Sequence, residues 1–109
     1  WMWYYKTVGN SKCPIVDTWW QTETGANMIA PIPGVTKTIP GTCTHPLPGI
    51  DVGIIDDDGL EINKPDQGGN LVIKKPWPSM LRGIWGDERR YKETYWDKFD
   101  NKYYITNYK

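Results

Sequence analysis

Nine consecutive residues near the N-terminus combine side chains that suit a nucleotide pocket. Residues 17–25 read DTWWQTETG and hold two indoles, three hydroxyls and two carboxylates. Hydroxyls and carboxylates cost free energy in a core unless they find partners, and indoles are costly to leave in water, so the mixture is typical of a pocket wall. An indole offers a flat surface to a purine, hydroxyls donate to phosphate oxygens, and a carboxylate can hold the magnesium of a triphosphate.

This run resembles the signature of the AMP-forming acetyl-CoA synthetases, which belong to the acyl-adenylate-forming enzyme superfamily. Further blocks are similar to that family in the same order and at similar spacing. They are APIPG (30–34), PGT (40–42), HPLPGIDV (45–52), GNLVI (69–73), PWPSMLR (76–82), WGD (85–87) and RYKETYW (90–96). The resemblance implies a ligase that converts acetate and ATP to acetyl-AMP and then transfers the acetyl group to CoA, with ATP, Mg²⁺ and CoA as its cofactors.

The resemblance implies catalytic roles for two neighbouring residues. Thr22 would contact the phosphate oxygens of ATP, and Glu23 would bind Mg²⁺. Adenylation is attack by a carboxylate on the α-phosphorus with release of pyrophosphate, so the protein mainly positions the reactants and neutralises phosphate charge. The residues alone leave a second interpretation open, because a Thr-Glu pair also suits the start of a helix.

The two tryptophans have different implied roles. Trp19 stands where the superfamily usually has an aromatic residue against adenine, whereas Trp20 stands where most members have glycine. An indole there fills the acyl pocket, so only a very short acid is expected to fit. Alternation along an extended segment would point the two rings to opposite sides. A propionyl-CoA synthetase stays an alternative, because one methylene is worth only about 1–3 kcal/mol.

Three more residues are expected to line the nucleotide site. Asp17 is expected to contribute through backbone groups, Thr18 through its hydroxyl and Gln21 through its amide, while Gln21 equally suits a surface position. The implied partners are the small molecules acetate, ATP and CoA together with the remainder of the parent enzyme.

The chain also departs from the family pattern. It has no Gly/Ser/Thr-rich phosphate loop, and the Thr-Gly-Asp expected after the last strand is replaced by Thr106-Asn107-Tyr108-Lys109. The family's C-terminal domain, which carries the adenylation lysine, has no counterpart among the 109 residues. We therefore expect a segment of the large N-terminal domain that does not turn over acetate by itself.

Composition argues against several other classes of protein. Thirteen basic residues balance thirteen acidic ones, which is unlike a nucleic-acid binder or a protein of anionic membranes. Two cysteines are too few for a disulfide framework, and the sequence shows neither a signal peptide nor a long apolar span. These features favour the cytoplasm.

The spacing of apolar residues and turn residues predicts a β-rich chain. A helix end at residues 1–8 precedes a strand at 13–19, and a later helix covers 87–96. An Asp-Gly turn at 56–59 is expected to join two strands into a hairpin, and two further strands follow. The expected strands lie at 50–55, 60–62, 70–74 and 103–106.

The predicted fold class is α+β and predominantly β. Residues 1–25 would supply a helix end, one strand of a neighbouring α/β sheet and the adenine and acyl pocket loop, and residues 26–109 would form a truncated segment of a distorted antiparallel β-barrel. An aromatic-rich carbohydrate-binding β module is the alternative from another class, because seven tryptophans and seven tyrosines could form a platform for sugar rings.

Overall fold

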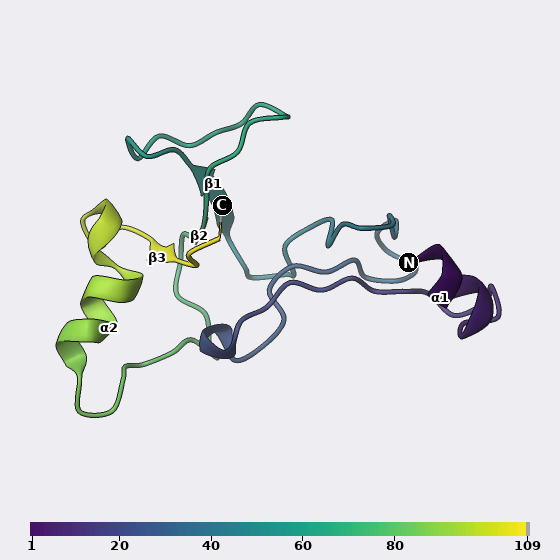
Figure 1. Cartoon of the computed structure of the whole chain (residues 1–109), viewed down its shortest axis with the longest axis horizontal. Helices are drawn as coiled ribbons and strands as arrows, with labels where there is room; N and C mark the ends of the chain where they lie inside the picture. Colours follow the sequence, from purple (N-terminus) through teal and green to yellow (C-terminus); the bar gives the residue numbers. More distant parts are fainter. Residues whose placement is uncertain (109) are drawn as a thin grey trace. The chain divides into compact units, whose positions relative to one another are not determined.

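The computed structural model describes residues 1–108, and the chain forms two compact units, Trp1–Gly49 and Ile50–Lys109. The architecture is mixed α/β, with an open three-stranded antiparallel sheet in the order β1-β2-β3 (Figure 1). The helices and strands are α1 (Met2–Thr7), β1 (Val52–Ile55), β2 (Asn70–Ile73), α2 (Glu88–Tyr95) and β3 (Tyr104–Ile105). Two 3-10 turns, η1 (Thr22–Thr24) and η2 (Asp97–Phe99), complete the elements. The predicted division at residues 25 and 26 concerns the parent enzyme and stays a prediction.

Helix α1 confirms the predicted helix end. Its last turn closes with hydrogen bonds from the N–H groups of Val8 and Gly9 to the carbonyl of Tyr4. Asn10 and Ser11, which follow the helix end, are both left-handed, with φ 48° and 53°. Gly9 is needed for a different reason, since a Cβ there would lie 2.8 Å from the Tyr5 carbonyl oxygen.

The predicted strand at 13–19 is wrong as a regular strand in the described part of the chain. Its one ladder contact is an antiparallel bridge between Trp19 and Ile29. A strand is defined by the backbone of a neighbour, and no neighbouring strand accompanies residues 13–18 within residues 1–108. The segment is nevertheless extended, because exposure alternates residue by residue from Ile15 to Thr22.

Three short extended pieces hold the N-terminal unit together. Trp19 donates from its N–H to the carbonyl of Ile29 (2.9 Å), and Met28 donates in return to Trp19 (3.0 Å). On the other side Leu47 donates to Met28 (2.8 Å), and Ala30 donates to the carbonyl of His45 (3.0 Å). Met28 and Ala30 are buried, so this pairing fixes the base from which the loop after Trp19 projects.

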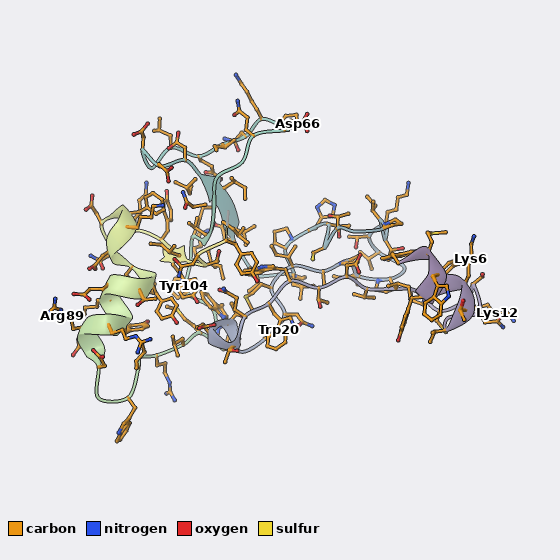
Figure 2. All side chains as sticks on the ribbon, viewed as in Figure 1. Lys6, Lys12, Trp20, Asp66, Arg89 and Tyr104 are labelled. Carbon is orange, nitrogen blue, oxygen red and sulfur yellow. The ribbon has the colours of Figure 1, made fainter. Side chains whose placement is uncertain are left out.

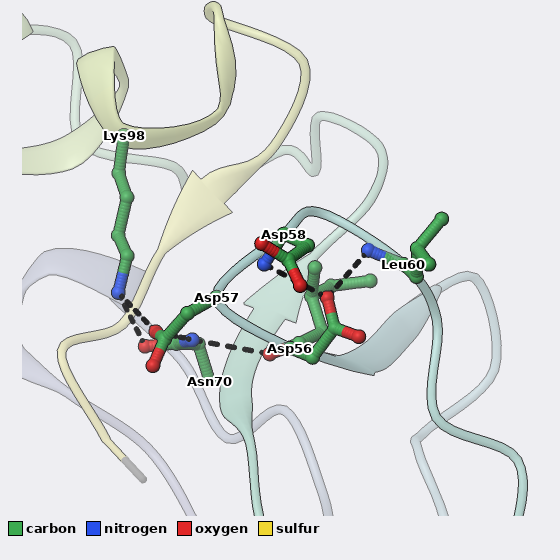
Figure 3. Close-up of polar contacts among 7 residues, drawn as sticks. Asp56, Asp57, Asp58, Leu60, Asn70 and Lys98 are labelled. Carbon is green, nitrogen blue, oxygen red and sulfur yellow. Dashed lines mark hydrogen bonds and ion pairs between the residues drawn. The ribbon is translucent and has the colours of Figure 1, made fainter.

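The predicted hairpin turn is confirmed around residues 56–59. One carboxylate oxygen of Asp56 accepts from the N–H groups of Asp58 (3.0 Å) and Leu60 (2.8 Å), as Figure 3 shows. Gly59 takes φ 84°, which suits a residue without a Cβ. The second arm is shorter than predicted. It meets β1 at the bridge between Ile55 and Glu61 and at the bond from Ile62 N–H to the Ile54 carbonyl, and the Asp56 N–H donates to the Leu60 carbonyl next to the turn.

The core of the C-terminal unit lies on the sheet. Ile55, Val72, Phe99 and Ile105 form one buried apolar cluster. Next to it, the ring of buried Tyr104 stacks on Tyr95 of α2 at 5.5 Å between centroids. The structure confirms the elements predicted for this half of the chain, namely the strands at 70–73 and 104–105 and helix α2.

Helix α2 is capped by Asp87 and carries charged pairs on its surface. The carboxylate of Asp87 accepts from the N–H of Arg90 (3.0 Å), which satisfies a first-turn donor. Its exposed face carries the ion pairs Arg89–Glu93 and Glu88–Lys92. No helix within residues 1–108 combines the length and the apolar character needed to cross a membrane.

Candidate functional site

The predicted pocket residues lie on one extended segment that ends in a tight turn. Their exposure alternates: Asp17, Trp19, Gln21 and Glu23 are half-buried, whereas Thr18, Trp20 and Thr22 are exposed. Alternating exposure is what an extended backbone produces, since successive side chains point to opposite faces. The segment therefore presents two different surfaces.

The two tryptophans belong to different surfaces of this segment. Trp19 is half-buried, and its backbone pairs with Ile29. Trp20 is 55% exposed and its side chain projects away from the ribbon (Figure 2). The different exposure of the two rings agrees with the expectation that they point to opposite sides of the segment.

After Gln21 the chain tightens into η1. Gln21 is still extended (φ −133°, ψ 161°), and the N–H of Thr24 then donates to its carbonyl at 3.1 Å. Gly25 ends the turn in the left-handed conformation with φ 66° and donates to the carbonyl of Thr22 at 3.2 Å. This turn places the Thr22 hydroxyl and the Glu23 carboxylate on adjacent residues of a single 3-10 turn.

Thr24 is a site residue that the sequence did not single out. It is completely buried, and its hydroxyl lies within hydrogen-bond distance of backbone groups of Gln21 and Ala26. A threonine one position after the Thr-Glu pair carries no signal of burial, because threonine is exposed in most proteins. Its role became visible only with the geometry of the turn.

Asp17 contacts another loop of the N-terminal unit. Its carboxylate oxygen Oδ2 accepts from the N–H of Gly41 at 3.1 Å. The same residue lines an open hollow of about 530 Å³, whose other walls belong to the same unit. The other lining residues are Trp1, Tyr4, Ile15, Gly41 and Cys43.

The charge of Asp17 acts on the thiol of Cys43. Burial raises the pKa of the Cys43 thiol above its ordinary value, and the nearby Asp17 carboxylate raises it further. Both effects favour the neutral thiol over the thiolate, which is the nucleophilic form. Cys43 is therefore less reactive at neutral pH than a cysteine of ordinary pKa.

Two hydrogen bonds hold Thr106 of the C-terminal motif in place. Thr106 is buried, its hydroxyl donates to the Leu71 carbonyl (2.7 Å), and it accepts from the N–H of Tyr108 (3.2 Å). Asn107 takes φ 60°, a left-handed conformation that asparagine tolerates better than most residues. Tyr108 thus stands where a carboxylate was expected, and Lys109 lies outside the described residues.

The donor chemistry at η1 fits a magnesium nucleotide. Mg²⁺ in such sites is usually held by one or two carboxylates together with substrate phosphates, and Glu23 offers a carboxylate one residue after the hydroxyl of Thr22. Among residues 1–108, no three or more His, Cys, Asp or Glu side chains are grouped so that they could hold a metal ion by themselves.

Comparison with known proteins places the segment in a larger context. The family model of the AMP-binding enzymes matches residues 1–85. Acetyl-coenzyme A synthetase of Chlorobaculum tepidum is 61% identical over 104 residues, which are 95% of this chain and 16% of that protein. The enzymes of the same name from Chromobacterium violaceum and Pasteurella multocida are 59% and 60% identical over 106 residues, 96% of this chain and 16% of each relative. The chain thus spans about one sixth of the length of these relatives.

Proposed function

The chain belongs to the AMP-binding enzyme family, and we propose that it is the segment of an acetyl-coenzyme A synthetase that carries part of the adenine and acyl pocket. The observation that carries this proposal is the 56–61% identity to acetyl-coenzyme A synthetases over nearly the whole chain. An aromatic-rich carbohydrate-binding module does not account for a match of this extent, and it is not favoured.

The proposed reaction has two steps. A carboxylate oxygen of acetate attacks the α-phosphorus of ATP, forming acetyl-AMP while pyrophosphate leaves. The sulfur of CoA then attacks the acetyl carbonyl, and AMP leaves as the thioester forms. The groups that bind CoA would lie in parts of the enzyme outside this segment.

The residues of η1 would act on the phosphates. Thr22 is exposed, so its hydroxyl is accessible to donate to a phosphate oxygen. Glu23 would hold Mg²⁺, which neutralises phosphate charge and favours departure of pyrophosphate. Their adjacency in one short turn supports a joint role, because both groups would then move together with the backbone.

The extended residues before the turn would bind the remaining parts of the substrates. Trp19 would lie against adenine and Trp20 would close the acyl pocket, with the alternating exposure of the two rings supporting separate roles. Thr18 and Gln21 would line the nucleotide through their polar side chains. Asp17 would contribute mainly through its backbone, since its carboxylate faces Gly41.

Two finer features of fold and setting are part of the proposal. We propose that the three-stranded sheet belongs to a distorted antiparallel barrel in the whole enzyme. The antiparallel pairing of β1, β2 and β3 supports this. We place the parent enzyme in the cytoplasm.

A chimeric enzyme tests the function directly. Residues 1–106 of this chain would replace the matching segment of the Chlorobaculum tepidum synthetase, so that the downstream residues of that enzyme are retained. Acetate-dependent exchange of pyrophosphate into ATP is expected in the chimera and not in the isolated 109-residue chain. A chimera that melts like the unaltered enzyme but shows no exchange would contradict the proposal.

Two substitutions make the test specific to the site. Glu23→Gln in the chimera is expected to lower kcat by about 100-fold, in line with losses of electrostatic stabilisation in other enzymes, and to raise the Mg²⁺ concentration needed for half-maximal rate. Glu93→Gln removes a carboxylate from the exposed face of α2 and serves as the matched control. If the two substitutions had equal effects, the proposal that Glu23 binds Mg²⁺ would be wrong.

A further inference from the structure

One buried hydroxyl joins the two ends of the turn that carries Thr22 and Glu23. The side chain of Thr24 is 0% exposed. Its Oγ1 accepts from the N–H of Gln21 at 2.9 Å. The same oxygen lies 2.8 Å from the Gln21 carbonyl and 2.9 Å from the Ala26 carbonyl, either of which can accept the hydroxyl proton.

These contacts are made to backbone groups of the loop, so they fix the conformation of the loop. Gln21 precedes η1 and Ala26 follows it, so one side chain connects the backbone on both sides of Thr22 and Glu23. Backbone groups that lose their partners in a part-buried loop cost free energy, and the loop would relax to recover them through other contacts. A small relaxation would move the Thr22 hydroxyl and the Glu23 carboxylate away from a bound triphosphate.

We propose that Thr24 is a positioning residue, whose hydroxyl holds residues 21–26 in the conformation that presents Thr22 and Glu23 to the phosphates of ATP. The inference rests on the proposed function for its catalytic consequence, while the structural part stands on the hydrogen bonds alone. Thr24 touches no substrate in this scheme and acts only through its neighbours.

Two substitutions separate the hydroxyl from the volume of the side chain. Thr24→Val keeps the branched shape and removes the hydroxyl, whereas Thr24→Ser keeps the hydroxyl and removes a methyl group. Thr7→Val makes the same chemical change at an exposed residue at the end of α1 and serves as a control.

Amide hydrogen exchange tests the structural part in the chain itself. Thr24→Val is expected to speed exchange of the Gln21 amide by about 10-fold or more, because that N–H loses its acceptor. Thr24→Ser and Thr7→Val are expected to leave this rate within about threefold of the original. An unchanged Gln21 rate in Thr24→Val would overturn the inference.

Kinetics of the chimera test the catalytic part. Thr24→Val is expected to lower kcat for pyrophosphate exchange by about 10- to 100-fold, as small misplacements of positioned groups do. The KM for acetate should stay within about threefold, since Thr22 and Glu23 act on the phosphates, and Thr24→Ser should recover most of the lost rate. A full kcat in Thr24→Val, or no rescue by serine, would overturn the positioning role.

The two proposals fail in different ways. A chimera with unaltered Thr24 that lacks exchange activity would count against the proposed function. In that case the Gln21 exchange rate would still decide whether the Thr24 hydroxyl holds the turn.

Discussion

The carboxylate of Asp17 accepts a hydrogen bond from the N–H of Gly41, a residue 24 positions later in the chain, at 3.1 Å. Gly41 lies in the Pro-Gly turn at 40–41 with φ 78°, a conformation that favours glycine. The bond ties the start of the candidate site to a loop of the same unit. It also fixes a negative charge near the Cys43 thiol, whose pKa this charge raises.

Neutralising Asp17 is expected to make Cys43 more reactive. In a Cys13→Ser background, Asp17→Asn removes the carboxylate charge, so the pKa of the Cys43 thiol should fall, although burial still holds it above the ordinary value. Below that pKa the alkylation rate follows the thiolate fraction, so the rate at pH 8 should rise by about twofold or more. Iodoacetamide labelling followed by mass spectrometry measures it. Asp66→Asn at an exposed position is the control, and equal rates in the two variants would contradict the expectation.

Asp51 is expected to make stability depend on acid pH. Hydrogen bonds from Lys75 and Lys74 lower the pKa of its carboxyl in the folded chain, so its contribution is present above the ordinary pKa of an aspartate and is lost as pH falls through the lowered value. Asp51→Asn should therefore show a smaller loss of the urea midpoint between pH 6 and pH 2.5 than the unaltered chain. Asp66→Asn should behave like the unaltered chain. If Asp51→Asn lost as much as the unaltered chain, the ion pairs would have no role in acid sensitivity.

A buried amide links the hairpin to η2, and its removal should lower stability. Asn70 is 5% exposed; its Nδ2 donates to the Ile55 carbonyl and to Asp57, and its Oδ1 accepts from Lys98 at 2.8 Å (Figure 3). Asn70→Ala leaves these groups without the amide, which should reduce the free energy of unfolding by about 1–3 kcal/mol. Urea titration against Asn63→Ala, at an exposed position, measures the difference. Equal midpoints would show that water replaces the amide without cost.

Local signals were sufficient to predict most elements of the C-terminal unit. The turn at 56–59 is stabilised by Asp56 and Gly59 themselves, and α2 begins at its own cap, Asp87. Such features depend on residues a few positions apart, so they can be read without knowledge of the fold. The alternation at residues 15–22 was predictable for the same reason.

Features that depend on distant partners were not predictable in the same way. Residues 13–18 have the apolar pattern of a strand, but a ladder needs a neighbour, and the described residues provide one only at Trp19. The burial of Thr24 and the bond between Asp17 and Gly41 likewise arise from tertiary contacts. The roles of Thr22, Glu23, Trp19 and Trp20 toward substrates stay predictions.

Restoring a carboxylate after Thr106 is expected to strengthen nucleotide binding. In a chimera that carries this chain through Tyr108, the pair Asn107→Gly and Tyr108→Asp keeps the left-handed turn and adds an acceptor for the ribose hydroxyls. Hydrogen bonds to a charged group are worth about 1.5–3 kcal/mol, so the KM for ATP should fall by about 10- to 100-fold. Tyr108→Asn with the same glycine tests for charge. A KM that does not respond to the aspartate would place the ribose elsewhere.

Trp19 and Trp20 differ in exposure, so their substitutions are expected to affect different substrates. Trp20 is 55% exposed in this chain, so its replacement by glycine removes an indole from a surface and not from a core. In the chimera, Trp20→Gly should open the acyl pocket and raise kcat/KM for butyrate relative to acetate by about 10-fold or more, since each methylene is worth about 1–3 kcal/mol. Trp19→Phe, on the other surface, should change the KM for ATP and leave acid preference unaltered.

Competition between acids of increasing length measures this preference directly. Trp85→Gly is the matched control, because it deletes an indole that is fully exposed and lies in the other unit of the chain. Acetate and propionate differ by one methylene, so butyrate and longer acids should show the effect more clearly than propionate. An acid preference that stays the same in Trp20→Gly, or shifts equally in Trp85→Gly, would remove Trp20 from the acyl pocket and leave chain-length selection to residues outside this segment.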